Sequence, residues 1–251
     1  MKRIIIFLLS LLFLAGCNEI TVMSYNIHAM RGMDGVIDAE RICDVIMAEK
    51  PDLVALQEVD QLTERSGYMD ALAIMKERCD MDGIFMKTFD YQGGGFGNVI
   101  LSRFPIIEQR VVNLPARENY EARLLMMISC VTDRGDTVHF YNTHLDHHSG
   151  DSDRPVQMAA IIDIVTSDNA TVILAGDLNC QPGSKPLNAL DKILIRCVSE
   201  EKTYPANVPE RIIDHVYYNV NGGLQCKSIY VVNETVASDH RPIVAKFKMS
   251  R

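Results

Sequence analysis

An acid and a histidine stand side by side near the end of the chain, in the segment VASDHRPIVAKF at residues 236–247. Asp239 and His240 come directly before an alternating apolar run that predicts a final β-strand. Such a pair can bind a metal ion or move a proton, because a carboxylate fixes the tautomer of an imidazole and raises its basicity. A solvated surface loop is the commoner outcome for one Asp-His step, so the interpretation depends on partners elsewhere.

Polar residues of the same kind stand at the ends of other apolar runs. They are Asn26 in MSYNI, Glu58 in LVALQEVD, His144 and Asp146 in YNTHLD, Asp177 and Asn179 in LAGDLN, and Asp214 in RIIDHVYY. Strand ends at one edge of a sheet converge, and ligands often bind there. Oxygen donors with two histidines and no cysteine suit Mg²⁺ or Mn²⁺, which commonly accompany phosphoryl groups. Each residue alone has a structural explanation, so their joint occurrence carries the hypothesis.

The segments between these residues predict strands interleaved with a few helices. A helix is expected over 38–51, with Asp38 as its N-cap and Pro51 as its terminator, and others over 68–79 and 154–165. The glycines at 93–95 predict a loop, and a loop-rich section is expected up to about residue 210. Strands are predicted at 19–27, 52–60, 97–104, 106–114, 123–131, 136–145, 170–178, 212–219, 224–232 and 242–249. This pattern favours one α/β domain in which two sheets pack face to face with helices outside.

The first sixteen residues have the features of a secretory signal. Lys2 and Arg3 precede an apolar run that is too short to span a membrane. The run closes with LAGC, which resembles the lipobox of bacterial lipoproteins, so Cys17 would be lipidated and begin the mature chain. An ordinary signal peptide followed by a coincidental cysteine is the alternative. We therefore expect an exported protein, in the periplasm or at the cell surface, anchored at Cys17 with a catalytic domain over 20–249.

The remaining composition limits the partners. Without residues 1–16 the chain keeps 23 Lys and Arg against 33 Asp and Glu, a formal charge of −10. Such a surface repels polyanions and argues against tight, sequence-independent binding of nucleic acid. Six further cysteines lack any C-x-x-C spacing, so disulfides and buried thiols both stay open and no zinc site is indicated.

The motifs in their chain order resemble the endonuclease/exonuclease/phosphatase superfamily, whose fold is deoxyribonuclease-I-like. They are MSYNI, LVALQEVD, GNVILSRFPI, YNTHLD, LAGDLN, RIIDHVYY and SDHRPIVAKF, and they run from about residue 20 to 248. Gly-Asp-x-Asn and Ser-Asp-His are the most specific marks. The resemblance implies a four-layer α/β/β/α sandwich with two mostly antiparallel sheets, and it is closest to a compact bacterial branch of metal-dependent hydrolases.

The resemblance also implies a metal site and an acid/base pair. Glu58 would be the principal ligand of Mg²⁺ or Mn²⁺, with Asn26 beside it and Asp239 sharing the ion. The ion would polarise a phosphate oxygen and offset developing charge. His240 would either activate water or bind the phosphate, and Asp214 would orient its ring.

Further residues would act around the phosphate. By the same resemblance, Asp177 would position or deprotonate the attacking water, while Asn179 and His144 would donate hydrogen bonds to phosphate oxygens. Asn98 and Arg123 match polar positions near the phosphate, and a purely structural role is an equal alternative for both.

The implied reaction is hydrolysis of a phosphoester, but the superfamily includes nucleases, phosphatases and other phosphodiesterases, so the fold does not name the substrate. Export and the acidic surface favour a small phosphoester or a lipid headgroup, acted on by a monomer at a membrane. A secreted nuclease is the alternative within the superfamily. An inactive binding module is the alternative of another class, and it predicts losses among the metal and acid/base residues, none of which is missing.

Overall fold

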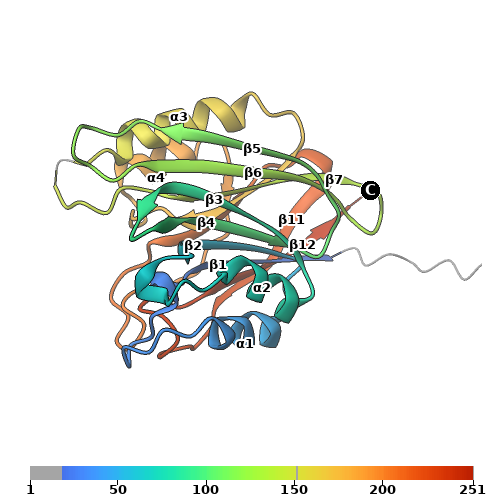
Figure 1. Cartoon of the computed structure of the whole chain (residues 1–251). Coiled ribbons are helices and arrows are strands. Elements are labelled where there is room, and N and C mark those ends of the chain that lie inside the picture. Colours follow the sequence, from blue (N-terminus) through green and yellow to red (C-terminus); the bar gives the residue numbers. More distant parts are fainter. Residues whose placement is uncertain (1–18, 151, 251) are drawn as a thin grey trace, which may run out of the picture.

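The computed structural model describes residues 19–150 and 152–250, so the predicted signal peptide and Cys17 lie outside the described part. Two six-stranded sheets form its centre (Figure 1). The first has the order β11-β12-β1-β2-β4-β3, built from Leu224–Val231, Ile243–Met249, Glu19–Asn26, Leu53–Gln61, Gly94–Ser102 and Asp82–Tyr91. The second has the order β5-β6-β7-β8-β10-β9, built from Ile106–Leu114, Arg123–Val131, Thr137–His144, Thr171–Asp177, Asp214–Tyr218 and Ile195–Arg196.

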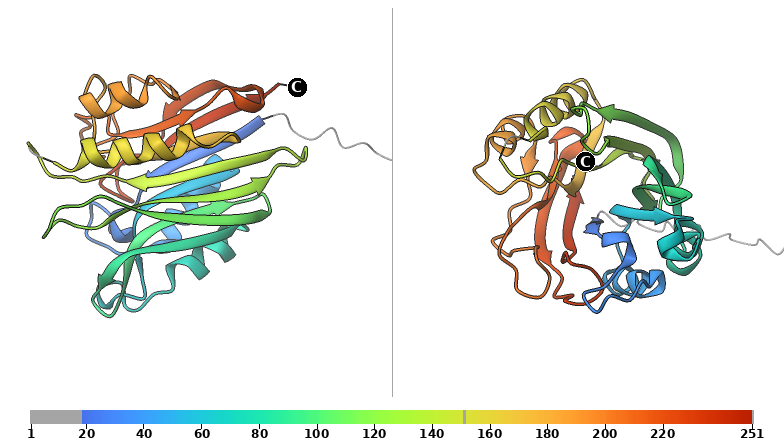
Figure 2. Two further views of the ribbon diagram at one scale, coloured as in Figure 1. Left: turned by 90° about the horizontal axis from the view of Figure 1, so that it is seen from above. Right: turned by 60° about the vertical axis from the view of Figure 1, so that its left-hand side comes forward.

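Each sheet is antiparallel apart from one central parallel pair, β1 with β2 and β7 with β8. A helix crosses between the strands of each pair: α1 (Ala39–Glu49) in the first and α3 (Arg154–Thr166) in the second. Helices α1 and α2 (Ala71–Cys79) lie outside the first sheet, and α3 and α4 (Lys185–Leu190) lie outside the second (Figure 2). The four-layer α/β/β/α sandwich is therefore confirmed.

Three apolar clusters, one at each interface, hold the four layers together. The middle one lies between the sheets and contains Phe140 and Phe247, both fully buried. A second joins α1 and α2 to the first sheet through residues such as Ile42 and Met75, and a third joins α3 and α4 to the second sheet through Ile161 and others. Burial of apolar side chains at all three interfaces is the main stabilising contribution to such a sandwich.

The local signals around α1 are confirmed. The Asp38 carboxylate accepts a hydrogen bond from the Arg41 amide, and the helix ends at Glu49, with Lys50 in a left-handed conformation just before Pro51. Among residues 19–150 and 152–250, no helix is both long and apolar enough to cross a membrane. The six cysteines beyond Cys17 are free thiols, four of them buried.

The predicted loop at residues 93–95 was wrong. Only Gly93 lies in a turn, because Gly94 and Gly95 already belong to β4, which forms a hairpin with the unpredicted strand β3. Strand β3 lies at a sheet edge and is mostly half-buried, so it lacks a clean apolar alternation. The section after residue 178, predicted to be rich in loops, also contains the short helix α4.

Candidate active site

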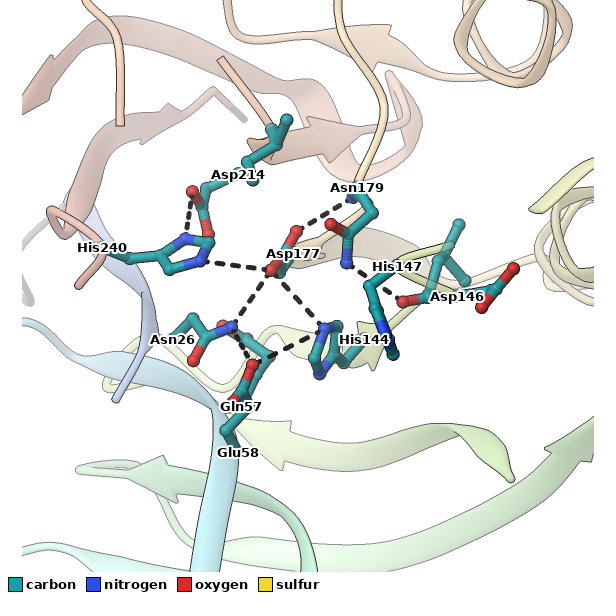
Figure 3. A network of polar contacts seen from close by, with 12 residues as sticks. Asn26, Gln57, Glu58, His144, Asp146, His147, Asp177, Asn179, Asp214 and His240 are labelled. Atoms are coloured by element: carbon teal, nitrogen blue, oxygen red, sulfur yellow. Dashed lines mark hydrogen bonds and ion pairs between the residues drawn. The ribbon is translucent and has the colours of Figure 1, made fainter. Parts of the chain in front are cut away.

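The polar residues converge because of the strand directions. The parallel pairs bring the carboxyl ends of β1, β2, β7 and β8 to one end of the sandwich, where Asn26, His144 and Asp177 terminate their strands. Strand β10 runs antiparallel to β8, so Asp214 at its start lies opposite Asp177. His240 precedes β12, which runs antiparallel to β1, and it reaches the same place (Figure 3).

Asn26 ties the two sheets together at this point. Its amide nitrogen donates to Glu58 Oε1 at 2.9 Å and to Asp177 Oδ2 at 3.0 Å. Its amide oxygen accepts from the His28 backbone N–H at 3.1 Å. In this orientation the amide nitrogen of Asn26 positions the carboxylates of Glu58 and Asp177.

Glu58 occupies an unusual backbone position. It has a φ of 56° inside β2, at a bulge where the pairing with β4 shifts register between Leu56 and Val59. A left-handed conformation in a non-glycine residue costs energy, and inside a strand it often accompanies a bulge next to a functional site. Its side chain is 25% exposed, and His144 Nε2 lies 3.9 Å from its carboxylate. The bulge therefore turns a carboxylate toward solvent at the convergence point.

His240 lies between two buried carboxylates. Its Nδ1 is 2.9 Å from Asp214 Oδ2, and its Nε2 is 3.7 Å from Asp177 Oδ2. Burial alone would lower the pKa of His240, but the negative charges of Asp214 and Asp177 outweigh it and raise that pKa to about 10. The ring is therefore an imidazolium at neutral pH, with both nitrogens able to donate.

Asp177 differs from an ordinary carboxylate. Burial, followed by the negative charge of Asp214, raises its pKa to about 7. The Asn179 backbone N–H donates to Asp177 Oδ1 at 2.9 Å and fixes the orientation of the side chain. Asp177 can thus gain or lose a proton near neutral pH, as acid/base groups of enzymes do.

His144 is held in the opposite charge state. Arg123 Nη1 lies 3.0 Å from His144 Nδ1, and a guanidinium can only donate, so Nδ1 is the acceptor and the proton is on Nε2. Burial and then the Arg123 charge keep the pKa of His144 well below its usual value. Its Nε2–H therefore points toward Asp177 Oδ2, 3.5 Å away, as a neutral donor. Arg123 is itself buried and pairs with Glu121 at 2.8 Å.

These groups face a cleft of about 480 Å³. The predicted residues that line it are Glu58, Arg123, His144, Asp177, Asn179, Asp239 and His240. Asn26 and Asp214 are buried and support the lining residues from below. Asn98 is buried in β4 and does not line the cleft, although strand register places it opposite the bulge that carries Glu58.

Two residues that the sequence analysis did not identify stand behind the site. Gln57 Nε2 donates to Asn142 Oδ1 at 2.8 Å, and Asn142 Nδ2 donates to the carbonyl oxygens of Leu56 and Val99. This buried link joins β2 to β7 close to Glu58 and His144. Their position inside otherwise apolar strands could have indicated such a link, because buried side-chain amides require hydrogen-bond partners.

The donor set fits a hard divalent cation. Glu58 and Asp239 each keep a quarter of their side chain exposed, and the described residues provide no arginine or lysine ion pair for either carboxylate. Asp177, Asp214 and His240 also form a compact buried group whose possible ligand atoms lie within 4.8 Å of one another, but His240 Nδ1 is already bonded to Asp214 Oδ2. Among the described residues, the other Asp214 oxygen, Oδ1, has no hydrogen-bond partner.

Comparisons with known proteins agree with this geometry. The model of the Endonuclease/Exonuclease/phosphatase family matches residues 23–240, and that of the prokaryotic membrane lipoprotein lipid attachment site matches residues 1–18. Uncharacterized protein YbhP of Escherichia coli (strain K12) is 24% identical over 250 residues, covering 91% of this chain and 96% of its own.

Two solved structures share the fold. The endonuclease/exonuclease/phosphatase from Beutenbergia cavernae DSM 12333 has a TM-score of 0.73 and 24% identity, covering 92% of this chain and 72% of that one. The mannosyl-6-phosphatase Bt3783 of Bacteroides thetaiotaomicron VPI-5482 has a TM-score of 0.75 and 19% identity, covering 91% and 99%. Because the family model spans most of its length, the chain belongs to the endonuclease/exonuclease/phosphatase family.

Proposed function

We propose that this chain is a divalent-metal-dependent phosphoester hydrolase, exported and held at a membrane through a lipid on Cys17. The observation that carries the proposal is the arrangement of two buried histidines on either side of Asp177 in one cleft, His144 held by Arg123 and His240 held by Asp214. A charged donor, a neutral donor and a carboxyl with a pKa of about 7 suit charge stabilisation and proton transfer at phosphorus.

Glu58 and Asp239 would hold the metal ion, with Asn26 orienting Glu58. Mg²⁺ or Mn²⁺ suits these oxygen donors, and when bound it would supply positive charge to a non-bridging phosphate oxygen. A cation near Glu58 would also favour the ionised form of Asp177, since its positive charge would oppose the burial and the Asp214 charge that together raise the pKa of that carboxyl.

The side chains would divide the reaction between them. Ionised Asp177 would accept a proton from water as the water oxygen bonds to phosphorus and the bond to the leaving oxygen breaks. His240 and the His144 Nε2–H would donate to the phosphate oxygens, with Asp214 orienting His240. Asn179 would donate through the second N–H of its amide, because the Leu145 carbonyl accepts the first at 3.1 Å. The charged state of His240 favours phosphate binding over water activation for this residue.

The substrate would be a small phosphoester or a lipid headgroup near the membrane. The lipid attachment motif at residues 1–18 supports an anchored protein. The formal charge of −10 in the mature chain disfavours nucleic acid as the substrate. We expect the protein to act as a monomer.

The test is hydrolysis by the full chain in detergent, with Mg²⁺ or Mn²⁺, of bis-p-nitrophenyl phosphate, p-nitrophenyl phosphate, plasmid DNA, sphingomyelin and phosphoinositides. Turnover should require metal and disappear in Glu58→Ala and His240→Ala, but persist in Glu77→Gln, a change of an exposed acid in α2. Turnover that survives both alanine changes, or absence of turnover together with absence of metal binding, would overturn the proposal.

A further inference from the structure

One wall of the cleft is aromatic. Phe89 of β3 stacks on Phe96 of β4 with ring centroids 5.0 Å apart, and Tyr91 of β3 meets Phe89 edge-on at 6.3 Å. The guanidinium carbon of Arg65 lies 4.5 Å above the Tyr91 ring. All four side chains line the cleft, and we call them the aromatic shelf.

Strand register places this shelf beside the proposed metal site. Asp60 of β2 pairs with Phe96 of β4, and Phe96 pairs with Phe89 of β3, so the three residues form a row across the sheet. Glu58 lies only two residues before Asp60 on the same strand. If the phosphate of a substrate lies at the metal site next to Glu58, the group bonded to that phosphate would therefore contact the aromatic shelf on this side of the cleft.

The glycine-rich segment GGGFG allows the shelf to form. A Cβ atom at Gly94 would lie 2.3 Å from the carbonyl oxygens of Gln61 and Leu62. A Cβ atom at Gly97 would lie 2.1 Å from the carbonyl oxygen of Met86. Since real side chains do not approach backbone so closely, glycine at both positions lets β4 pack tightly between β2 and β3 and present Phe96.

Arg65 is fixed on the shelf by a buried partner. Asp60 is fully buried, and it accepts hydrogen bonds from Arg65 Nε and, at 2.8 Å, from Arg65 Nη2. The Thr63 hydroxyl also donates to Asp60 at 2.8 Å. Within the described residues, Arg65 Nη1 has no hydrogen bond, and the side chain is 30% exposed in the cleft. The shelf thus offers flat apolar faces and one rigid cationic donor.

We propose that the aromatic shelf binds the ring of the substrate's alcohol part, so that the preferred substrates are phosphoesters of a ring-bearing alcohol. This inference rests on the proposed function. A ring can lay its face on either Phe89 or Tyr91, whose planes stand at 84° to each other, and an oxygen on its edge can accept from Arg65 Nη1. An acyclic alcohol such as glycerol has no face to stack, so the shelf discriminates against it.

The test compares three phosphate monoesters: glucose 6-phosphate, phenyl phosphate and glycerol 3-phosphate. The full chain in detergent is titrated with each in the presence of Mg²⁺, with binding followed by broadening of ligand NMR lines and turnover by the phosphorus spectrum. We expect at least one of the ring compounds to bind about tenfold more tightly than glycerol 3-phosphate. Comparing glucose 6-phosphate with phenyl phosphate shows whether the shelf prefers a sugar ring or an aromatic ring.

Tyr91→Leu should reduce the preference for rings to within about twofold and raise KM with little change in kcat. Phe89→Leu serves as a second variant if Tyr91→Leu fails to fold. Tyr68→Leu is the matched control, because Tyr68 is 61% exposed and lies outside the cleft. Equal affinity for all three compounds, or an unchanged preference in Tyr91→Leu and Phe89→Leu, would overturn the inference. Ring preference without turnover of any compound would count against the proposed function alone.

Discussion

The two sheets share one plan but present their acids differently. In each sheet a parallel pair joined by a helix forms the centre, β1-α1-β2 in one and β7-α3-β8 in the other, with two antiparallel strands on either side. The carboxylates of the first sheet, Glu58 and Asp239, are each 25% exposed. Those of the second sheet, Asp177 and Asp214, are 2% and 1% exposed.

This difference separates two kinds of chemistry. An accessible carboxylate without a cationic partner can bind a metal ion from solvent, because the ion can reach its oxygens and no arginine or lysine competes for them. The buried carboxylates have a fixed geometry, which suits orientation, and the raised pKa of Asp177 suits proton transfer. His240 comes from the first sheet but lies against the closed carboxylates of the second, so it joins the two halves.

The largest expected effect comes from removing one acid on each side. Glu58→Gln and Asp177→Asn should each lower kcat/KM about a thousandfold, because one removes a metal ligand and the other the proton acceptor. Excess Mg²⁺ should restore part of the activity of Glu58→Gln and none of that of Asp177→Asn. Activity measured against Mg²⁺ concentration checks this, and equal restoration of both variants would contradict the division between the sheets.

A smaller effect is expected from the partner of His240. Asp214→Asn keeps the shape of the side chain but removes the charge that lies 2.9 Å from His240 Nδ1. The pKa of His240 should fall from about 10, and kcat should fall about a hundredfold, since the ring loses both its charge and its orientation. NMR titration of His240 measures the first and steady-state kinetics the second. An unchanged kcat with a lowered pKa would mean that the charge of His240 is not used.

Much of this site could be predicted from the sequence, because a polar residue directly after a short apolar run indicates the end of a strand. Asn26, His144 and Asp177 each follow an apolar run, and parallel strands bring such ends to one edge. The direction in which each side chain donates could not be predicted in this way. The tautomer of His144 depends on Arg123, which comes from a neighbouring strand through register.

The features that failed from sequence are those fixed by contacts distant along the chain. Strand β3 is evident only from its pairing with β4. The segment GGGFG predicted a loop, but its glycines instead allow the strands to pack closely. The Gln57–Asn142 link, which spans 85 residues of sequence, also depends on which strands are neighbours. No local pattern marks such pairs, because the same residues on a strand elsewhere would be solvated.

The smallest expected effect concerns the acid sensitivity of the closed half. His215 is buried on the side of β10 away from the cleft, with its Nε2 2.8 Å from the Cys180 carbonyl oxygen. Burial lowers the pKa of His215 to about 4, from 6.5. Between those values the unfolded chain binds a proton that the folded protein does not. The free energy of unfolding should therefore decrease as the pH is lowered from 6.5 toward 4, by up to about 1.4 kcal/mol for one pH unit.

Other groups act in the same window, so the measurement needs a matched variant. His144 contributes with the same sign, because its pKa is also lowered. Asp177 opposes it, since its raised pKa lets the folded protein hold a proton between pH 3.8 and about 7. His240 is protonated in both states there and adds nothing. Comparing urea unfolding of the wild type and His215→Gln from about pH 6.5 to about pH 4.5 cancels these shared terms. The advantage of the wild type should shrink as the pH falls. A constant difference would show that His215 gains its proton as readily in the fold as in the unfolded chain, and the second sheet would then not be closed on this side.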